Sequence, residues 1–205
     1  MIKIEKTEVF GWESAIRAMR NPMNSWDKDD SCWGSGEGYV IGKNNLALMK
    51  KLSKAGNDHA KFLRMINVTA DITAPLYWWK EYDTYKVGTV ANSCSTMHKI
   101  HDKEFTMDDF SHEHLELLSM ECLTNTIEII NHYREWFIRD KNKVDWWQMI
   151  QLLPTSYNQK RTVQLNYQVL KSMYFSRRNH KLDEWHTLCD WILTLPYFKE
   201  ICVDE

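Results

Sequence analysis

Residues 66–85 read INVTADITAPLYWWKEYDTY, and this stretch decides the fold. Apolar side chains alternate with Asn, Thr and Asp over residues 66–72, which predicts a strand with one buried face. Pro75 suits the first turn of a helix, because proline lacks the N–H group that such a turn leaves unpaired. We therefore expect a helix from Pro75 through the two tryptophans to about Tyr85.

The chain before this stretch carries the signals of a strand, two helices and a loop. Residues 2–9 alternate in character and predict a short strand. Residues 12–20 have apolar side chains at helical spacing and are followed by an Asn-Pro pair, which ends a helix. Residues 24–42 are rich in Asp, Ser and Gly and predict a loop. Asn44 is expected to cap the next helix, and Gly56 suits the position just past its end.

The second half of the chain is predicted to be helical after an irregular segment at residues 88–95. Residues 112–139 form the longest amphipathic pattern, and we expect a central core helix there. Its expected core face comprises Leu115, Leu118, Cys122, Ile129, Tyr133 and Trp136. Further helices are expected at residues 144–153, 161–179 and 182–195. We predict one domain over residues 1–205 with an α+β fold, a small antiparallel sheet with a dominant layer of long helices.

Composition narrows the class of protein. The formal net charge is -2 and the basic residues are scattered, so the sequence lacks the basic patch of a nucleic-acid partner. No apolar run reaches the ~20 residues that cross a bilayer. The five cysteines are odd in number and contain no Cys-x-x-Cys pair, which favours reduced thiols and a cytoplasmic location. Ten Trp, nine Tyr and seven Phe predict extensive helix packing, a subunit interface or a pocket for a planar ligand.

Two candidate sites flank the predicted strand. Asp58 and His59 follow the helix end at Gly56, where such a pair can bind a ligand or form an exposed, capped turn. Beyond the strand, Lys80, Glu81 and Tyr82 lie beside the two tryptophans. Charge next to an apolar wall can shift a pKa or accompany a stacked planar ring, and a buried ion pair is the alternative.

A third candidate lies near the C-terminus, where Asn166 and Arg177 are eleven residues apart. That spacing is about three helical turns and would place both on one helix face. An arginine there could hold a phosphate or a pyrimidine carbonyl, with Arg178 and His180 adding positive charge. Favourable charge at a helix C-terminus is the alternative. A fourth group contains His98, His101, His112 and His114, but it shows no recognised metal-ligand spacing, and we predict no metal site.

The order of these segments resembles the flavin-dependent thymidylate synthases (ThyX). The matching segments are Ala15-Ile16-Arg17, residues 48–56, Asp58-His59 with Phe62, Leu153-Pro154, and Asn166 with Arg177. Lys80-Glu81-Tyr82 stand where the family has Arg-His-Arg. Residues 86–91 are an insertion, after which Ser95 takes the position of the family's active-site serine and Met97 replaces its arginine.

This resemblance implies methylation of dUMP to dTMP, with FAD as the cofactor and with sites between the subunits of a homotetramer. The catalytic residues implied are Ser95, Lys80, Glu81 and Tyr82. FAD would be contacted by Asp58, His59 and Asn166, and the nucleotide by Arg177 and Arg178. The altered motif also fits a catalytically inactive scaffold that acts as a binding or assembly protein. A metal-dependent helical hydrolase built on the histidine group is a third hypothesis.

Overall fold

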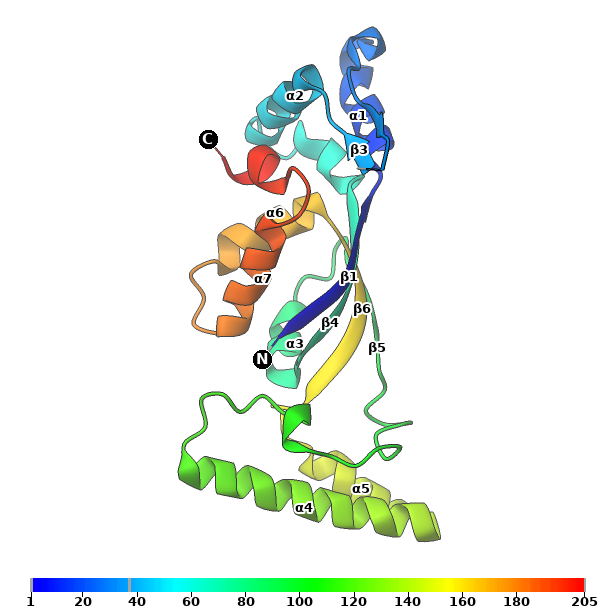
Figure 1. Cartoon of the computed structure of the whole chain (residues 1–205), viewed down its shortest axis with the longest axis vertical. Helices are drawn as coiled ribbons and strands as arrows, with labels where there is room; N and C mark the ends of the chain where they lie inside the picture. The colour runs from blue at the N-terminus through cyan, green and yellow to red at the C-terminus, as the bar shows by residue number, and fades with distance from the viewer. Residues whose placement is uncertain (1, 37, 205) are drawn as a thin grey trace. The chain divides into compact units, whose positions relative to one another are not determined.

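The structure is a computed structural model that describes residues 2–36 and 38–204. It confirms the α+β fold, with a small antiparallel sheet and a large helical content. The sheet has the strand order β1-β4-β6-β5 (Figure 1). Its strands are β1 (Lys3–Phe10), β4 (Asn67–Pro75), β6 (Asn158–Asn166) and β5 (Val90–Ser93). Over the described part of the chain, no helix has both the length and the apolar character that crossing a membrane requires.

The chain forms two compact units. Unit 1 consists mainly of residues 71–84 and 92–162, and unit 2 of residues 4–70, 85–91 and 163–205. All four strands of the sheet, β1, β4, β6 and β5, begin in one unit and end in the other. The expectation of a single domain stays a prediction.

Unit 1 contains α3 (Leu76–Tyr82) and the packed pair α4 (Leu117–Asp140) and α5 (Lys143–Leu152), which lie side by side in Figure 1. Pro75 directly precedes α3 and is extended, so the expected strand-to-helix step is confirmed, although α3 ends three residues before Tyr85. A buried cluster fastens α4 and α5 to the preceding loop. It comprises Ile100, Phe105, Phe110, Leu123, Ile127, Ile130 and Met149.

The prediction that residues 112–139 form a central core helix was wrong in two respects. The helix α4 begins at Leu117, after a turn, and its buried side chains are Leu123, Ile127 and Ile130. Most of the face expected to be the core is exposed instead; Leu118, for example, is 80% exposed, whereas Tyr133 is half-buried against the cluster. A helical pattern with apolar residues on two sides does not reveal which side the rest of the chain covers.

Unit 2 contains α1 (Trp12–Arg20), α2 (Lys43–Lys54), α6 (Tyr167–Arg177) and α7 (Asp183–Leu193), together with short 3₁₀ turns. The bounds predicted for α1 are confirmed. The expected loop at residues 24–42 was wrong in part, because it contains a hairpin in which β2 (Cys32–Gly34) pairs antiparallel with β3 (Gly38–Val40). The expectation of an irregular segment at residues 88–95 was also wrong in part, because β5 lies there.

Two further predictions of local structure were wrong. The helix expected from residue 161 begins only at Tyr167, because residues up to Asn166 belong to β6. Helix α2 is not capped by Asn44. Its first free N–H groups, those of Asn44 and Asn45, donate to the carboxylate of Asp30 at 2.8 and 3.0 Å. A cap supplied from fourteen residues away leaves no local sequence signal.

Candidate functional site

Arg177, the last residue of α6, is held between two aromatic rings of unit 2. Its Nε donates a hydrogen bond to the Tyr85 hydroxyl at 3.0 Å. Its guanidinium carbon lies 4.7 Å from the Trp185 ring centroid and 5.6 Å from that of Tyr85. These distances are those of cation–π contacts, so the arginine is positioned by its neighbours before any ligand arrives.

Asn166 lies at the other end of α6 and forms its N-cap. Its Oδ1 accepts a hydrogen bond from the backbone N–H of Val169 at 3.0 Å, which satisfies one of the unpaired N–H groups of the first turn. Gly88 approaches this cap closely. A Cβ at Gly88 would lie 3.0 Å from the Asn166 Nδ2, and the residue has φ +79°.

The segment Tyr85–Ala91 therefore borders both predicted ligand-binding residues of α6. Tyr85 contacts Arg177, and Gly88 lies against Asn166. The sequence spacing predicted that Asn166 and Arg177 share one helix face. In the structure Asn166 is the N-cap that precedes α6, and the two residues share the segment Tyr85–Ala91 as a neighbour.

Asp58 and His59 are exposed in the turn that follows Gly56. The turn is tied to the start of α6, because Gln168 Nε2 donates to the Oδ1 of Asn57 at 3.4 Å. The next 3₁₀ turn, Ala60–Arg64, packs on α6 and carries exposed basic side chains. His59 therefore lies in the chain beside the basic side chains of Lys61 and Arg64, and the turn that carries these two residues packs on α6. Such a set of hydrogen-bond donors fits a phosphate-bearing cofactor such as FAD.

Arg178 is the C-cap residue of α6 and is exposed. Its guanidinium carbon lies 5.2 Å from the Phe175 ring centroid and 5.9 Å from that of Tyr174. The aromatic neighbours restrict the side chain while its charged end faces solvent. An anion near the end of α6 would therefore meet a second, less enclosed guanidinium.

The residues predicted for catalysis lie in unit 1. Lys80 is exposed on α3, Glu81 is half-buried and Tyr82 is 2% exposed. The Tyr82 hydroxyl has no hydrogen-bond partner among the described residues, and its ring lies 5.0 Å from that of Trp79. Burial raises the pKa of Tyr82 far above its ordinary value, and Asp83 raises it further. The Tyr82 phenol is therefore kept neutral, which does not suit a role as a general base.

Ser95 is exposed in unit 1 and stabilises a turn. Its Oγ accepts hydrogen bonds from the backbone N–H groups of Met97 at 3.1 Å and His98 at 3.0 Å. Side chains of serine commonly close turns in this way. No hydrogen bond from the Ser95 hydroxyl to a basic side chain is found among the described residues.

Arg161 is a candidate that the sequence did not indicate. Its guanidinium carbon lies 4.2 Å from the Trp79 ring centroid, and its Nη1 donates to Asp83 at 2.8 Å. Within β6, exposed Thr162 and Gln164 alternate with buried Val163 and Leu165, and the two apolar side chains are each 1% exposed. That alternation was the signal for a strand, and a strand places Arg161 beside the tryptophan.

The histidine group does not gather into a metal site. Within residues 2–36 and 38–204, no cluster of three or more His, Cys, Asp or Glu side chains is arranged to hold a metal ion. The His101 ring packs edge-on against Phe137 at 4.8 Å, and His112 Nδ1 lies 2.8 Å from the carbonyl of Phe110.

Two neighbouring cavities in unit 2 were not anticipated. One, of about 600 Å³, lies between α1 and the β2–β3 hairpin, and the other, of about 780 Å³, lies between the hairpin, β1 and the segment after α7. Trp33 and Tyr39 line both. The available signal was the presence of Trp26, Trp33 and Tyr39 in a stretch otherwise rich in Asp, Ser and Gly.

Comparison with known proteins shows likeness at the level of the fold. No family model and no curated protein matches the sequence. Among solved structures, the chain is similar to thymidylate synthase X (ThyX) from Helicobacter pylori with FAD and dUMP, with a TM-score of 0.70 and 13% identity over 100% of this chain and 98% of that one. A second structure of Helicobacter pylori ThyX with FAD and dUMP gives a TM-score of 0.70 and 14% identity over 98% of each chain. The chain therefore has a ThyX-like fold along its whole length.

Proposed function

We propose that this protein is a divergent ThyX-like protein that binds FAD and the pyrimidine nucleotide dUMP, and that it methylates dUMP to dTMP. The observation that carries the proposal is the fold likeness, over the full chain, to ThyX structures that contain both molecules. The identity of 13–14% leaves the site to be argued from the residues of this chain.

The residues of unit 2 support the nucleotide and flavin assignments. Arg177 has its guanidinium fixed by Tyr85 and Trp185, and Arg178 is exposed beside it, so both suit the phosphate of dUMP. Asp58, His59 and Asn166 lie on elements packed around α6 and are proposed to contact FAD. When bound, FAD supplies the redox chemistry, which the protein's side chains cannot provide.

The residues of unit 1 divide into two groups by exposure. Lys80 and Ser95 are exposed, so we propose that they contact substrate. Tyr82 is enclosed by Trp78 and Trp79, and half-buried Glu81 lies next to it on α3. We propose that Glu81 and Tyr82 contribute to catalysis by holding α3, and with it Lys80, in place.

Calorimetric titration with FAD and with dUMP tests the proposal. Arg177→Gln removes the charge and should weaken dUMP binding about tenfold or more while FAD binding persists. Tyr85→Phe retains the ring and the charge of Arg177 but removes the hydroxyl that orients it, so dUMP binding should weaken by a smaller factor. A folded wild-type protein that binds neither FAD nor dUMP would refute the proposal.

The second candidate is a catalytically inactive scaffold that acts as an assembly protein. It is favoured by the exposed side of α4, where Leu118, Cys122, Asn125, Ile129, His132 and Trp136 recur at alternating spacings of four and three. That spacing is typical of helices that pair with other helices. Binding of FAD and dUMP without growth of a thymidine auxotroph would favour this candidate, and growth would exclude it.

The same face of α4 supports a homo-oligomer, which we propose to be a tetramer. Light scattering after size exclusion should give a mass above that of one chain. Ile129→Glu places a charge in the centre of the exposed apolar face and should shift the mass downward. Thr124→Glu adds the same charge at an exposed position outside that face and should leave the mass unchanged. A monomeric wild-type protein would contradict this assembly.

A further inference from the structure

The cavity between α1 and the β2–β3 hairpin is a second candidate binding site, separate from the residues assigned to FAD and dUMP. It has a volume of about 600 Å³, which is within the range of small-molecule pockets. Trp33 and Tyr39 form an aromatic wall, with ring centroids 5.2 Å apart and an edge-to-face arrangement. Trp33 is nevertheless 66% exposed, an unusual position for so large an apolar surface in a folded protein.

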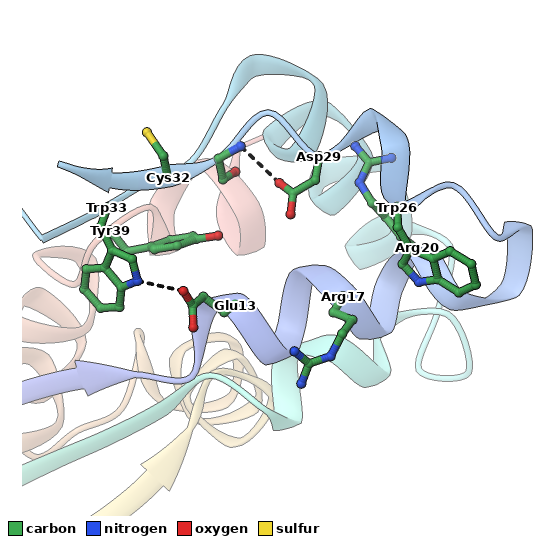
Figure 2. A pocket seen from close by; sticks show the side chains of 9 residues that line it. Glu13, Arg17, Arg20, Trp26, Asp29, Cys32, Trp33 and Tyr39 are labelled. Atoms are coloured by element: carbon green, nitrogen blue, oxygen red, sulfur yellow. Dashed lines mark hydrogen bonds between the residues drawn. The ribbon is translucent and has the colours of Figure 1, made fainter.

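Two carboxylates face this space, and each has an oxygen without a described partner. Glu13 accepts a hydrogen bond from the Trp33 indole N–H at 2.7 Å through Oε1 only. Asp29 accepts from the Ser31 backbone N–H at 3.0 Å and from Asn45 Nδ2 at 2.6 Å, both through Oδ1. Figure 2 shows these carboxylates and the Tyr39 hydroxyl turned toward the space between α1 and the hairpin.

The carboxylates impose a negative potential on the cavity wall. Burial raises the pKa of the Tyr39 hydroxyl, and Asp29, Glu13 and Cys32 raise it further, because a phenolate would be repelled by their charges. A cation would be attracted both by the carboxylates and by the faces of the aromatic rings.

The two arginines of the cavity do not cancel this preference. Arg20 is 4% exposed, and its donors are directed to the Asn45 side chain and to the carbonyls of Ser25 and Lys28 at 2.7–3.1 Å. Arg17 is exposed, and its guanidinium extends away from Asp29 (Figure 2). An anion in the cavity would therefore rely on a rearranged Arg17 alone, whereas a cation finds its partners already in place.

A network of hydrogen bonds holds the wall that carries Asp29. Asn45 is fully buried and connects Arg20 to Asp29 and to the Ser31 hydroxyl at 2.6–2.8 Å. Ser31 Oγ in turn accepts from the backbone N–H of Gly42 at 2.9 Å. Asp29 is thus held in place by a network, and binding does not have to order it.

We propose that this cavity binds a small organic cation, an alkylammonium or alkylguanidinium compound. The charged group lies between the carboxylates of Glu13 and Asp29, and the apolar part lies against Trp33 and Tyr39. The same chemistry occurs in free amines and in the side chain of a peptide arginine, so the test includes both sources.

Calorimetric titration of the full chain with agmatine, with the peptide Gly-Arg-Gly amide and with pyrophosphate tests the proposal. Agmatine should bind, and Glu13→Gln and Asp29→Asn should each weaken it about tenfold, since each removes one charge from a site with two. Both substitutions retain an oxygen acceptor for the existing hydrogen bonds. Tighter binding of the peptide than of agmatine, with the same loss in Glu13→Gln, would support the site and assign the cation to a protein side chain.

Arg17→Gln is the matched control. Arg17 lines the same cavity, but its guanidinium points away from Asp29. Removing its positive charge should leave the binding of agmatine unchanged or make it tighter. The proposal is overturned if folded wild-type protein binds no agmatine at about 10 mM. It is also overturned if both carboxylate variants bind agmatine like the wild type, or if pyrophosphate binds and Arg17→Gln abolishes that binding.

Discussion

Replacement of Asn45 by alanine should be among the most destabilising single changes at a polar residue of unit 2. The side chain is fully buried and makes three hydrogen bonds, with Arg20 Nε at 2.8 Å, Asp29 at 2.6 Å and Ser31 at 2.7 Å. A lost neutral bond costs about 1 kcal/mol, and a buried donor left unpaired, here the Nε of Arg20, costs about 1–3 kcal/mol. We expect Asn45→Ala to lower the free energy of unfolding by about 3 kcal/mol, or the melting temperature by roughly 6–12 °C.

Urea unfolding followed by circular dichroism measures this difference, and Asn44→Ala is the control. The Asn44 side chain is exposed and makes no side-chain hydrogen bond in the described structure, while its backbone N–H to Asp30 survives the change. The control should change the free energy of unfolding by less than about 0.5 kcal/mol. If the two variants agree within that margin with an unchanged m-value, the network does not hold Asp29 in place, and this account of the cavity wall is refuted.

Four further predictions concern the thiols and the buried tyrosines. In the folded protein a thiol reagent should modify three cysteines quickly and spare Cys189 and Cys202, whose burial raises their thiol pKa to about 11 and about 12; denaturant should expose all five. In the folded protein both thiol pKa values exceed the ordinary 9.0, so the two neutral thiols contribute fully to stability below pH 9, and this contribution is lost as the pH rises toward 12. Cys202→Ala should therefore reduce the fall in melting temperature at alkaline pH. Tyr167→Phe removes the 2.6 Å bond to the Pro196 carbonyl and should cost about 1 kcal/mol in urea unfolding. Tyr82→Phe removes a hydroxyl without a described partner and should cost nothing; equal losses in the two tyrosine variants would contradict this account.

Local signals in the sequence were sufficient for elements with a clear period and a clear end. The Asn-Pro pair ends α1 at Arg20, as expected, because proline has no backbone N–H group to continue the helical hydrogen bonds. The alternation in β4 is reproduced in its burial, with Val68, Ala70, Ile72 and Ala74 all buried. One physical property, the side-chain period, determined both the prediction and the outcome.

The missed elements depend on contacts between distant residues. Strands β2 and β3 have three residues each and are stabilised by each other, so neither shows enough alternation to be recognised. In β6 the alternation was present but was read as the first turn of α6. The exposed face of α4 could not be assigned, since the amphipathic pattern fixes an apolar stripe and not the element that covers it.

The sites show the same division between local and distant information. The sequence indicated Arg177, but its partner Tyr85 is 92 positions away, and no spacing rule connects them. The cavity bounded by Glu13 and Asp29 depends on a hairpin that was not predicted, and its aromatic wall forms only when β2 pairs with β3. Residue type alone was therefore enough to indicate Arg177, whereas the cavity beside α1 could be recognised only from the fold.

The contrast between Arg177 and Arg17 shows why contacts with neighbouring side chains decide which arginine is ready for a ligand. A guanidinium whose Nε is bonded to Tyr85 and whose face lies on Trp185 has already lost most of its rotamer freedom, so a phosphate that binds it pays little further ordering entropy. An exposed arginine such as Arg17 would have to be ordered by the ligand itself. The same reasoning favours dUMP at the end of α6 and a cation, rather than an anion, beside α1. Both proposals therefore rest on which charged groups the fold has already fixed in place.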